Sequence, residues 1–187
     1  MHPFITGTKI NLCILTKSDI TDEYVNWFND KEDCQFNSHY RFPNTYEKTL
    51  HYIENTSDIV FGIVTKQKHS HIGNTVFGIV TEQESRHIGN ICLQNINWID
   101  RTADISIIIG EKTQWGKGYG AEAYRLIIDY AFNVLNLRRL ASALTTDNQG
   151  MRWVCAKNGM EYEGTSKQVL FKAGEYIDIV HFAILKQ

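Results

Sequence analysis

The sequence predicts an α/β fold in which a mixed β-sheet carries helices on both faces. Strand-like and helix-like segments alternate along most of the chain, which is the pattern of a sheet covered by helices. A glycine-rich turn joins an apolar, strand-like run to a long helical pattern. The chain closes with two strand-like runs, residues 167–171 and 176–185, joined by a hairpin turn.

The first third of the chain predicts one strand followed by two helices. Residues 9–15 alternate in polarity and are rich in β-branched side chains, which indicates a strand. A helix with capping residues at its start is predicted to run to about residue 29. After a polar and aromatic loop at residues 31–43, a capping-box spacing predicts a second helix over residues 45–55.

Two neighbouring segments are near copies of each other. Residues 60–74 and 76–90 agree at 11 of 15 positions when they are aligned at an offset of 16. Each copy reads as strand, turn and strand, so the local sequence does not decide which copy enters the sheet. We expect residues 87–97 to stay in the sheet and the surplus to form an extra hairpin near residues 65–80, because hairpin tips tolerate insertions. A slipped or domain-swapped pairing is the alternative.

The second half of the chain predicts alternating strands and helices. Residues 103–110 are nearly all apolar, as in a strand covered on both faces. Residues 121–135 have helical periodicity, and residues 137–144 read as the next strand. A last helix is predicted from about residue 148 to Gly159, where glycine favours a helix end.

The glycine-rich turn lies between the central strand and the helix that follows it. Gly116, Gly118 and Gly120 alternate with other residues, and glycine lets the backbone turn sharply and approach a ligand. The first N–H groups of a helix lack partners within the helix and stand at the positive end of its dipole, so this turn suits a phosphate. The spacing does not match the dinucleotide fingerprint or the nucleoside-triphosphate loop. A tight turn that binds no ligand is the alternative.

Composition and charge exclude several classes of protein. The 187 residues predict one domain, residues 1–187, and 43% hydrophobic residues are enough for a core. A net charge of −2 without a basic run gives no support for a nucleic-acid partner. No apolar stretch is long enough to span a membrane, and the N-terminus does not resemble a signal peptide. Four separated cysteines predict reduced thiols, a cytoplasmic location and no bound metal.

The turn and its flanking elements resemble the acetyl-CoA motif of the GNAT N-acetyltransferases. The family pattern is Arg/Gln-x-x-Gly-x-Gly/Ala, and Gly118 and Gly120 stand at its glycine positions. Trp115 departs from the Arg/Gln position, although Gln114 precedes it, and residues 157–160 match the family's Lys-x-Gly-Phe/Met. The likeness is strongest to the branch that acetylates ribosomal-protein N-termini and small amines. It implies the GNAT fold, a mostly antiparallel sheet of about seven strands, here with an extra hairpin from the duplication.

The resemblance implies that acetyl-CoA is the cosubstrate and that no metal is needed. Backbone N–H groups of the turn would hold the pyrophosphate, and the central strand would pair with the pantetheine arm like an added strand. One N–H of that strand would face the thioester oxygen, a type of donor that contributes roughly 3–4 kcal/mol to catalysis. Asn148 would contact the cofactor, cap its helix, or do both. The implied cofactor-binding residues are Ile107, Ile108, Ile109, Gln114, Trp115, Gly116, Lys117, Gly118, Tyr119, Gly120, Ala121 and Asn148.

The same resemblance suggests candidates for proton transfer. Many family members use a tyrosine as the acid for the departing thiolate, and Cys155 stands at that position here. A thiol with a pKa of about 8.5 can donate a proton, but a buried cysteine more often only packs. Asp104, at the start of the central strand, is our first candidate for the base, acting through water. Asp178 is the second, with a surface salt bridge as the alternative for each carboxylate.

The two N-terminal helices flank the acceptor pocket in this family. The resemblance therefore makes Trp27, Phe28, His39 and Tyr40 candidate acceptor contacts, with ordinary core or loop positions as the alternative. We predict that the acceptor is a primary amine of a small molecule, an amine or amino sugar, which attacks the thioester directly. Acetylation of a protein N-terminus and a non-catalytic acyl-CoA-binding module are the competing hypotheses. The sequence leaves the oligomeric state open, a homodimer included.

Overall fold

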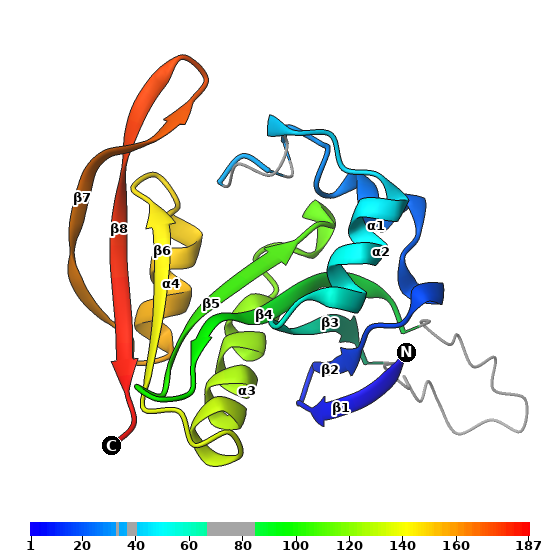
Figure 1. The fold of residues 1–187 in the computed structure, drawn as a ribbon, viewed down its shortest axis with the longest axis horizontal. Coiled ribbons are helices and arrows are strands. Elements are labelled where there is room, and N and C mark those ends of the chain that lie inside the picture. The colour runs from blue at the N-terminus through cyan, green and yellow to red at the C-terminus, as the bar shows by residue number, and fades with distance from the viewer. Residues whose placement is uncertain (33, 37–40, 67–84) are drawn as a thin grey trace, which may run out of the picture.

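A single sheet of eight strands runs through the molecule (Figure 1). The computed structural model describes residues 1–32, 34–36, 41–66 and 85–187. The strands lie in the order β1-β2-β3-β4-β5-β6-β8-β7. All neighbouring strands are antiparallel except β5 and β6, which are parallel. This confirms the predicted mixed, mostly antiparallel sheet.

The bounds of the elements follow the sequence prediction closely in the second half of the chain, except that β7 begins at Glu161, well before the predicted residues 167–171. The strands are β1 (His2–Thr6), β2 (Ile10–Ile14), β3 (Ile59–Thr65), β4 (His87–Asn97), β5 (Thr102–Ile109), β6 (Arg139–Thr145), β7 (Glu161–Lys172) and β8 (Glu175–Leu185). The helices are α1 (Asp22–Asn26), α2 (Tyr46–Asn55), α3 (Tyr119–Asn133) and α4 (Gln149–Lys157), with short 3-10 turns at η1 (Lys17–Asp19) and η3 (Lys112–Gln114).

The sheet contains one strand more than predicted, because β1 precedes the first predicted strand. It pairs antiparallel with β2 and forms the outer edge of the sheet. Pro3 lacks a backbone N–H, which an edge strand tolerates. Gly7 makes the turn between the two strands, where its N–H donates to Ile10 O at 3.0 Å. A Cβ at this glycine would lie 2.7 Å from the backbone oxygen of Ile10, so the tight turn favours glycine.

The duplicated segment contributes one strand from each copy. β3 comes from the start of the first copy, and β4 begins near the end of the second copy. The prediction that residues 87–97 stay in the sheet is therefore confirmed. Ile59 gives a reason for the choice of β3, because it packs against the core and pairs with Leu93, whereas Thr75 precedes the second copy. The extra hairpin was predicted near residues 65–80. Most of it lies outside the described residues, because residues 67–84 are not among them.

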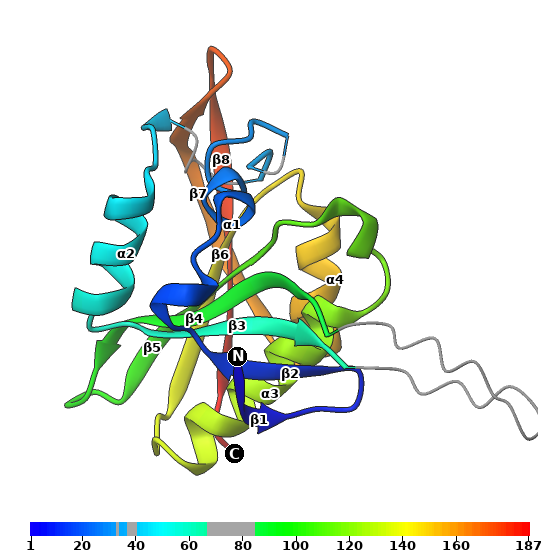
Figure 2. The same cartoon turned by 90° about the vertical axis from the view of Figure 1, so that its right-hand side faces the viewer.

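Helices cover both faces of the sheet (Figure 1, Figure 2). α3 buries eight residues and, with α4, packs on one face to form the main core. α1 and α2 form a smaller apolar cluster on the other face, and Ile108 of β5 packs against it. Ile107 of β5 packs against the main core, whereas its neighbour Ile108 packs against the cluster of α1 and α2. β5 therefore separates the two apolar clusters. Among the described residues, no helix is both long and apolar enough to cross a membrane.

Candidate active site

The site forms where β5 and β6 separate. The two strands pair only over Thr102–Asp104 and Arg139–Ala141, and they diverge beyond these residues (Figure 1). β6 continues beside β8 along its length, and β5 continues beside β4. The far half of β5 therefore has a free edge on the side of β6.

Backbone groups on that free edge point into the opening. Hydrogen-bond direction alternates along an antiparallel strand. Gly110 N–H donates to Ile88 O of β4 at 3.0 Å, whereas Ile105 O accepts from a serine hydroxyl of β6 at 3.3 Å. Even-numbered residues thus turn their backbone groups to β4 and odd-numbered residues turn theirs to β6. Ile107 and Ile109 consequently turn their backbone groups toward the opening.

The glycine-rich turn closes one end of this opening. Gly116 and Gly118 have φ values of +76° and +84°, a conformation that strongly favours glycine. Gly118 is the N-cap of α3 and provides no side-chain cap, so N–H groups of the first turn stay available for an anion. Trp115 fastens the turn to the strand, because its indole Nε1 donates to Ile109 O at 2.8 Å.

A cavity of about 450 Å³ occupies the opening and brings the predicted cofactor residues together. Every predicted cofactor residue except Lys117 lines it. The Lys117 ammonium instead donates to Gln114 Oε1 at 2.9 Å. Further lining residues that the sequence analysis missed are Gln35, Phe36, Gly150, Met151, Trp153 and Val154. Most of these come from α4. No sequence motif marks the residues of this helix that face the cavity.

Asn148 lies where β6 leads into α4. Its Oδ1 accepts from Met151 N–H at 3.0 Å, so it caps the helix. The residue also lines the cavity and is buried. The predicted capping role is confirmed, and the position beside the cavity is compatible with the predicted cofactor contact.

A second cavity, of about 330 Å³, lies between β5 and the helices α1 and α2. Its lining includes Ile107 and Ile108, which also line the first cavity. The two cavities therefore share two lining residues in the middle of β5. The other lining residues are Tyr24, Phe28, Asn44, Lys48, Thr49, Tyr52, Val60, Asn90, Cys92, Gln94 and Ser106. Tyr24 is the most buried aromatic residue of this set, and the sequence analysis did not name it as a candidate contact.

The predicted acceptor contacts divide into three groups. Phe28 lines the second cavity, a position compatible with the predicted acceptor contact. Trp27 does not, because it is 4% exposed and packs edge-on against Tyr24 and His87 at 5.5 and 5.0 Å. Its ring fills the space beside Gly110, where a Cβ would lie 2.1 Å from it. Trp27 is therefore a core residue. His39 and Tyr40 lie outside the described residues.

Neither predicted carboxylate lines a cavity among the residues that the structure describes. Asp104 accepts from Asn95 Nδ2 at 2.9 Å and lies two residues before Ser106, on the same face of β5. Asp178 accepts from Lys167 Nζ and Gln168 N–H, both at 2.9 Å, within the β7–β8 hairpin. The hydrogen bond from Lys167 lowers the pKa of Asp178. This second carboxylate therefore occupies the alternative position, a surface salt bridge.

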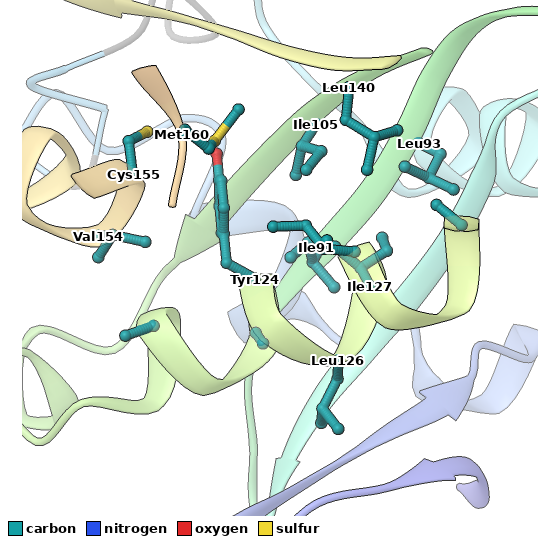
Figure 3. Close-up of a cluster of buried hydrophobic side chains, with 14 of the residues drawn as sticks. Ile91, Leu93, Ile105, Tyr124, Leu126, Ile127, Leu140, Val154, Cys155 and Met160 are labelled. Carbon is teal, nitrogen blue, oxygen red and sulfur yellow. The ribbon is translucent and has the colours of Figure 1, made fainter. Parts of the chain in front are cut away.

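Cys155 lies in the hydrophobic core, where Figure 3 shows it near Val154 and Met160. It is fully buried and lines neither cavity. Burial raises the pKa of its thiol to about 12, which makes proton donation to a thiolate unfavourable. The prediction of Cys155 as an acid is corrected on this ground, because the residue faces the core while Trp153, two positions earlier, faces the cavity.

The titratable groups of the second cavity are mostly held uncharged at neutral pH. Burial raises the pKa of Tyr24 to about 12 and that of Cys92 to about 11, and it also raises the pKa of Tyr52. Lys48 donates to Pro43 O at 3.0 Å and is the one formal charge among the described lining residues. Within the described part of the chain, no group of three or more histidine, cysteine or acidic side chains is arranged to hold a metal ion.

Comparisons with known proteins agree with this architecture. The spermidine N(1)-acetyltransferase of Escherichia coli (strain K12) is 33% identical over 94 residues, 50% of either chain. YdaF of Bacillus subtilis (strain 168), named as a candidate ribosomal N-acetyltransferase, is 33% identical over 97 residues, 52% of either chain. The matches thus span about half the length of these curated relatives.

Solved structures are similar over nearly the whole chain. The spermidine N-acetyltransferase of Vibrio cholerae, solved in complex with CoA and spermine, has a TM-score of 0.76, 21% identity and 96% coverage of both chains. At that identity the likeness concerns the fold. The family description "Acetyltransferase (GNAT) domain" matches residues 10–161, most of the chain. The protein therefore belongs to the GNAT acetyltransferase domain family.

Proposed function

We propose that this protein transfers the acetyl group of acetyl-CoA to the primary amine of a small molecule. The observation that carries the proposal is that Ile107 and Ile108, in the middle of β5, line both cavities. One cavity has the free strand edge and the glycine turn, and the other is closed by α1 and α2. Two substrates that enter from different sides can therefore bring a thioester and an amine together at the middle of β5.

The chain fits acetyl-CoA through its backbone. The uncapped N-terminus of α3 at Gly118 suits the pyrophosphate. The backbone groups of Ile107 and the N–H of Ile109 suit the amides of the pantetheine arm, which would add to the edge of β5. An N–H on the same edge would stabilise the thioester oxygen as it gains charge, a contribution of about 3–4 kcal/mol.

The chemical step requires no covalent intermediate on the protein. The amine nitrogen attacks the carbonyl carbon, the C–S bond breaks, and its electron pair stays on the sulfur. The sulfur takes up one proton while the nitrogen releases one to water. Thiols have pKa values near 8.5, so a thiolate is a tolerable leaving group without a dedicated acid. Asp104, two residues from the lining of the second cavity, remains our candidate for accepting the proton through water.

The second cavity supports a small, singly charged acceptor. Its volume of about 330 Å³ lies in the range for small-molecule sites. Lys48 is its only formal charge, and no carboxylate belongs to the lining that the structure describes. A polyamine carries several ammonium groups that call for carboxylate partners. We therefore propose an amine or amino sugar in preference to a polyamine such as the spermine of the Vibrio cholerae structure.

The test is an acceptor panel of glucosamine, 2-aminoethanol, spermidine and a peptide with a free N-terminus, with acetyl-CoA as donor. Release of free thiol above the rate with water is expected for the first two compounds. A higher kcat/KM for spermidine or the peptide would contradict the proposed acceptor class. Saturable CoA binding without thiol release for every amine would instead support a non-catalytic acyl-CoA-binding module.

A further inference from the structure

The hydroxyl of Tyr24 has an unusual position in the acceptor cavity. Tyr24 is 2% exposed and packs edge-on against Trp27 and Phe28, which fixes its ring. Its Oη accepts a hydrogen bond from Asn90 Nδ2 at 2.6 Å. Because the oxygen is engaged as an acceptor, the proton of the hydroxyl must point to another partner.

His87 fixes the direction of this hydrogen-bond chain. Its Nε2 lies 2.9 Å from Asn90 Oδ1 and 2.9 Å from Gly89 O. Two oxygen neighbours require a proton on Nε2, so the imidazole donates and Asn90 Oδ1 accepts. The amide NH2 group of Asn90 must then face Tyr24. The chain therefore runs from His87 through Asn90 to Tyr24 and ends in an O–H donor that has no acceptor among the described residues.

That donor belongs to a residue hydrogen-bonded to Asn90, the cross-strand partner of Ile108, and Ile108 lines both cavities. Asn90 pairs directly with Ile108 across β4 and β5, and side chains of such cross-strand pairs are roughly 5 Å apart. Tyr24 lines the acceptor cavity together with both residues. Burial raises the pKa of Tyr24 to about 12, so the group stays an O–H donor across the working pH range.

The other tyrosine of the cavity provides a contrast. Tyr52 Oη donates to Asp58 Oδ2 at 2.7 Å, so its proton already has a partner. Tyr24 and Tyr52 thus line the same cavity with opposite hydrogen-bond roles. Burying a hydroxyl donor without an acceptor costs free energy. A ligand with an oxygen that accepts this hydrogen bond is therefore expected to be preferred over an analogue without that oxygen.

We propose that Tyr24 donates a hydrogen bond to an oxygen of the acceptor, next to its amine, and that the preferred acceptors are 1,2-amino alcohols, amino sugars among them. The inference rests on the proposed function. The amine must reach the thioester at Ile107 and Ile108, and the Tyr24 hydroxyl lies beside the same position. An oxygen on the carbon adjacent to the amine-bearing carbon places both groups in reach at once. In this arrangement Asn90 and His87 are positioning residues.

A matched pair of acceptors tests the proposal. trans-2-Aminocyclohexanol and cyclohexylamine differ by one hydroxyl, and kcat/KM for each is measured by thiol release. We expect the wild type to prefer the amino alcohol by about tenfold or more. Tyr24→Phe is expected to bring this ratio close to one while retaining turnover of cyclohexylamine. Tyr52→Phe is the control, because it should change both values by the same factor and keep the ratio.

The outcomes separate this proposal from the proposed function. An equal loss for both amines in Tyr24→Phe, or no preference in the wild type, would overturn the role of Tyr24. If no amine releases thiol, the proposed function fails, but calorimetric binding of the two compounds to the CoA-loaded protein still tests the inference. The same preference in Kd, lost in Tyr24→Phe and kept in Tyr52→Phe, is then expected. Equal affinities, or no binding of the amino alcohol, would refute it.

Discussion

Two residues of α4 show how burial decides a role at the scale of single residues. Trp153 and Cys155 are two positions apart, roughly 200° around a helix, so they must face nearly opposite sides. The sequence shows this separation but not which residue meets the cavity, because both side chains are apolar. Packing decides it, with Cys155 fully buried in the core and Trp153 on the cavity wall.

The buried position of Cys155 predicts a stability effect without a catalytic one. Cys155→Ala removes a buried sulfur and should lower the free energy of unfolding by about 1 kcal/mol. Turnover with the best amine should be unchanged, because the thiol lines neither cavity. Urea unfolding and thiol-release kinetics measure the two effects. A large fall in kcat at unchanged stability would restore Cys155 as a candidate acid.

Substitution of Gly118 is expected to weaken CoA binding as well as to lower the free energy of unfolding. Gly118→Val strains a residue at φ +84°, at a cost of about 1–3 kcal/mol in unfolding free energy. It also displaces the amides that suit the pyrophosphate, so Kd for CoA should rise at least about tenfold.

Gly174→Val is the matched control for that prediction. Gly174 has φ +92° in the β7–β8 turn, and a Cβ added there would have no other described atom within 4 Å. The variant should therefore suffer a similar strain and retain CoA binding. Equal calorimetric affinities of the Gly118 and Gly174 variants for CoA would contradict the assignment of the turn.

His87 predicts a pH dependence of stability. Burial lowers its pKa below the ordinary value of 6.5, so the folded state binds the proton less readily than the unfolded state. The stabilisation is complete above pH 6.5 and is lost as the pH falls toward the folded-state pKa. His87→Gln should flatten the decline of the free energy of unfolding below pH 6.5. Parallel pH curves for variant and wild type, measured by urea unfolding, would rule this out.

At the scale of elements, the duplication illustrates what strand propensity leaves undecided. β3 and the start of the second copy share the sequence Val-Phe-Gly-Ile-Val-Thr, so either segment can pair with β2 and β4. The flanking residue Ile59 distinguishes the first copy, because it packs against the core. Among the described residues, each copy contributes one strand.

Deletion of residues 66–81 should leave the fold intact. Thr65 N–H donates to Arg86 O at 2.9 Å, so the deletion would join β3 and β4 through residues 82–85. A loop of about four residues is a common hairpin connection. We expect CoA affinity and the midpoint of thermal unfolding to stay close to the wild-type values. Loss of the cooperative transition would show that the additional residues support the sheet.

At the scale of the molecule, the site depends on the divergence of β5 from β6 and on the helices of both faces. No single element supplies a complete cavity, because β5 contributes to both cavities while α3 and α4 line one and α1 and α2 close the other. The two cavities thus depend on the sheet as a whole.

Ligand binding to such a composite site should stabilise the whole fold. At a CoA concentration of about 100 times its Kd, the folded state gains about 2.7 kcal/mol. For a chain of this size that corresponds to a rise in Tm of about 5–10 °C. Differential scanning fluorimetry measures the shift, and in Gly118→Val at the same CoA concentration the shift should fall to about half or less. A shift of equal size in that variant would place the cofactor elsewhere.

The sequence by itself determined the order of most elements, the glycine turn at the start of α3 and the cap of α4. These features depend on residues a few positions apart, such as Gly116 and Gly118 with positive φ, or Asn148 three residues before its partner amide. It also indicated most of the cofactor cavity, because that cavity follows from one strand–turn–helix unit.

Only the tertiary structure decided which polar and aromatic groups line the second cavity. Tyr24 contacts Asn90, 66 residues away, whereas Trp27 on the same segment is sealed in the core. Asp178 is held by Lys167 in a hairpin, and Cys155 faces the core. Local patterns show that a residue is apolar or charged, but its role is fixed by burial and by partners that are distant in the chain.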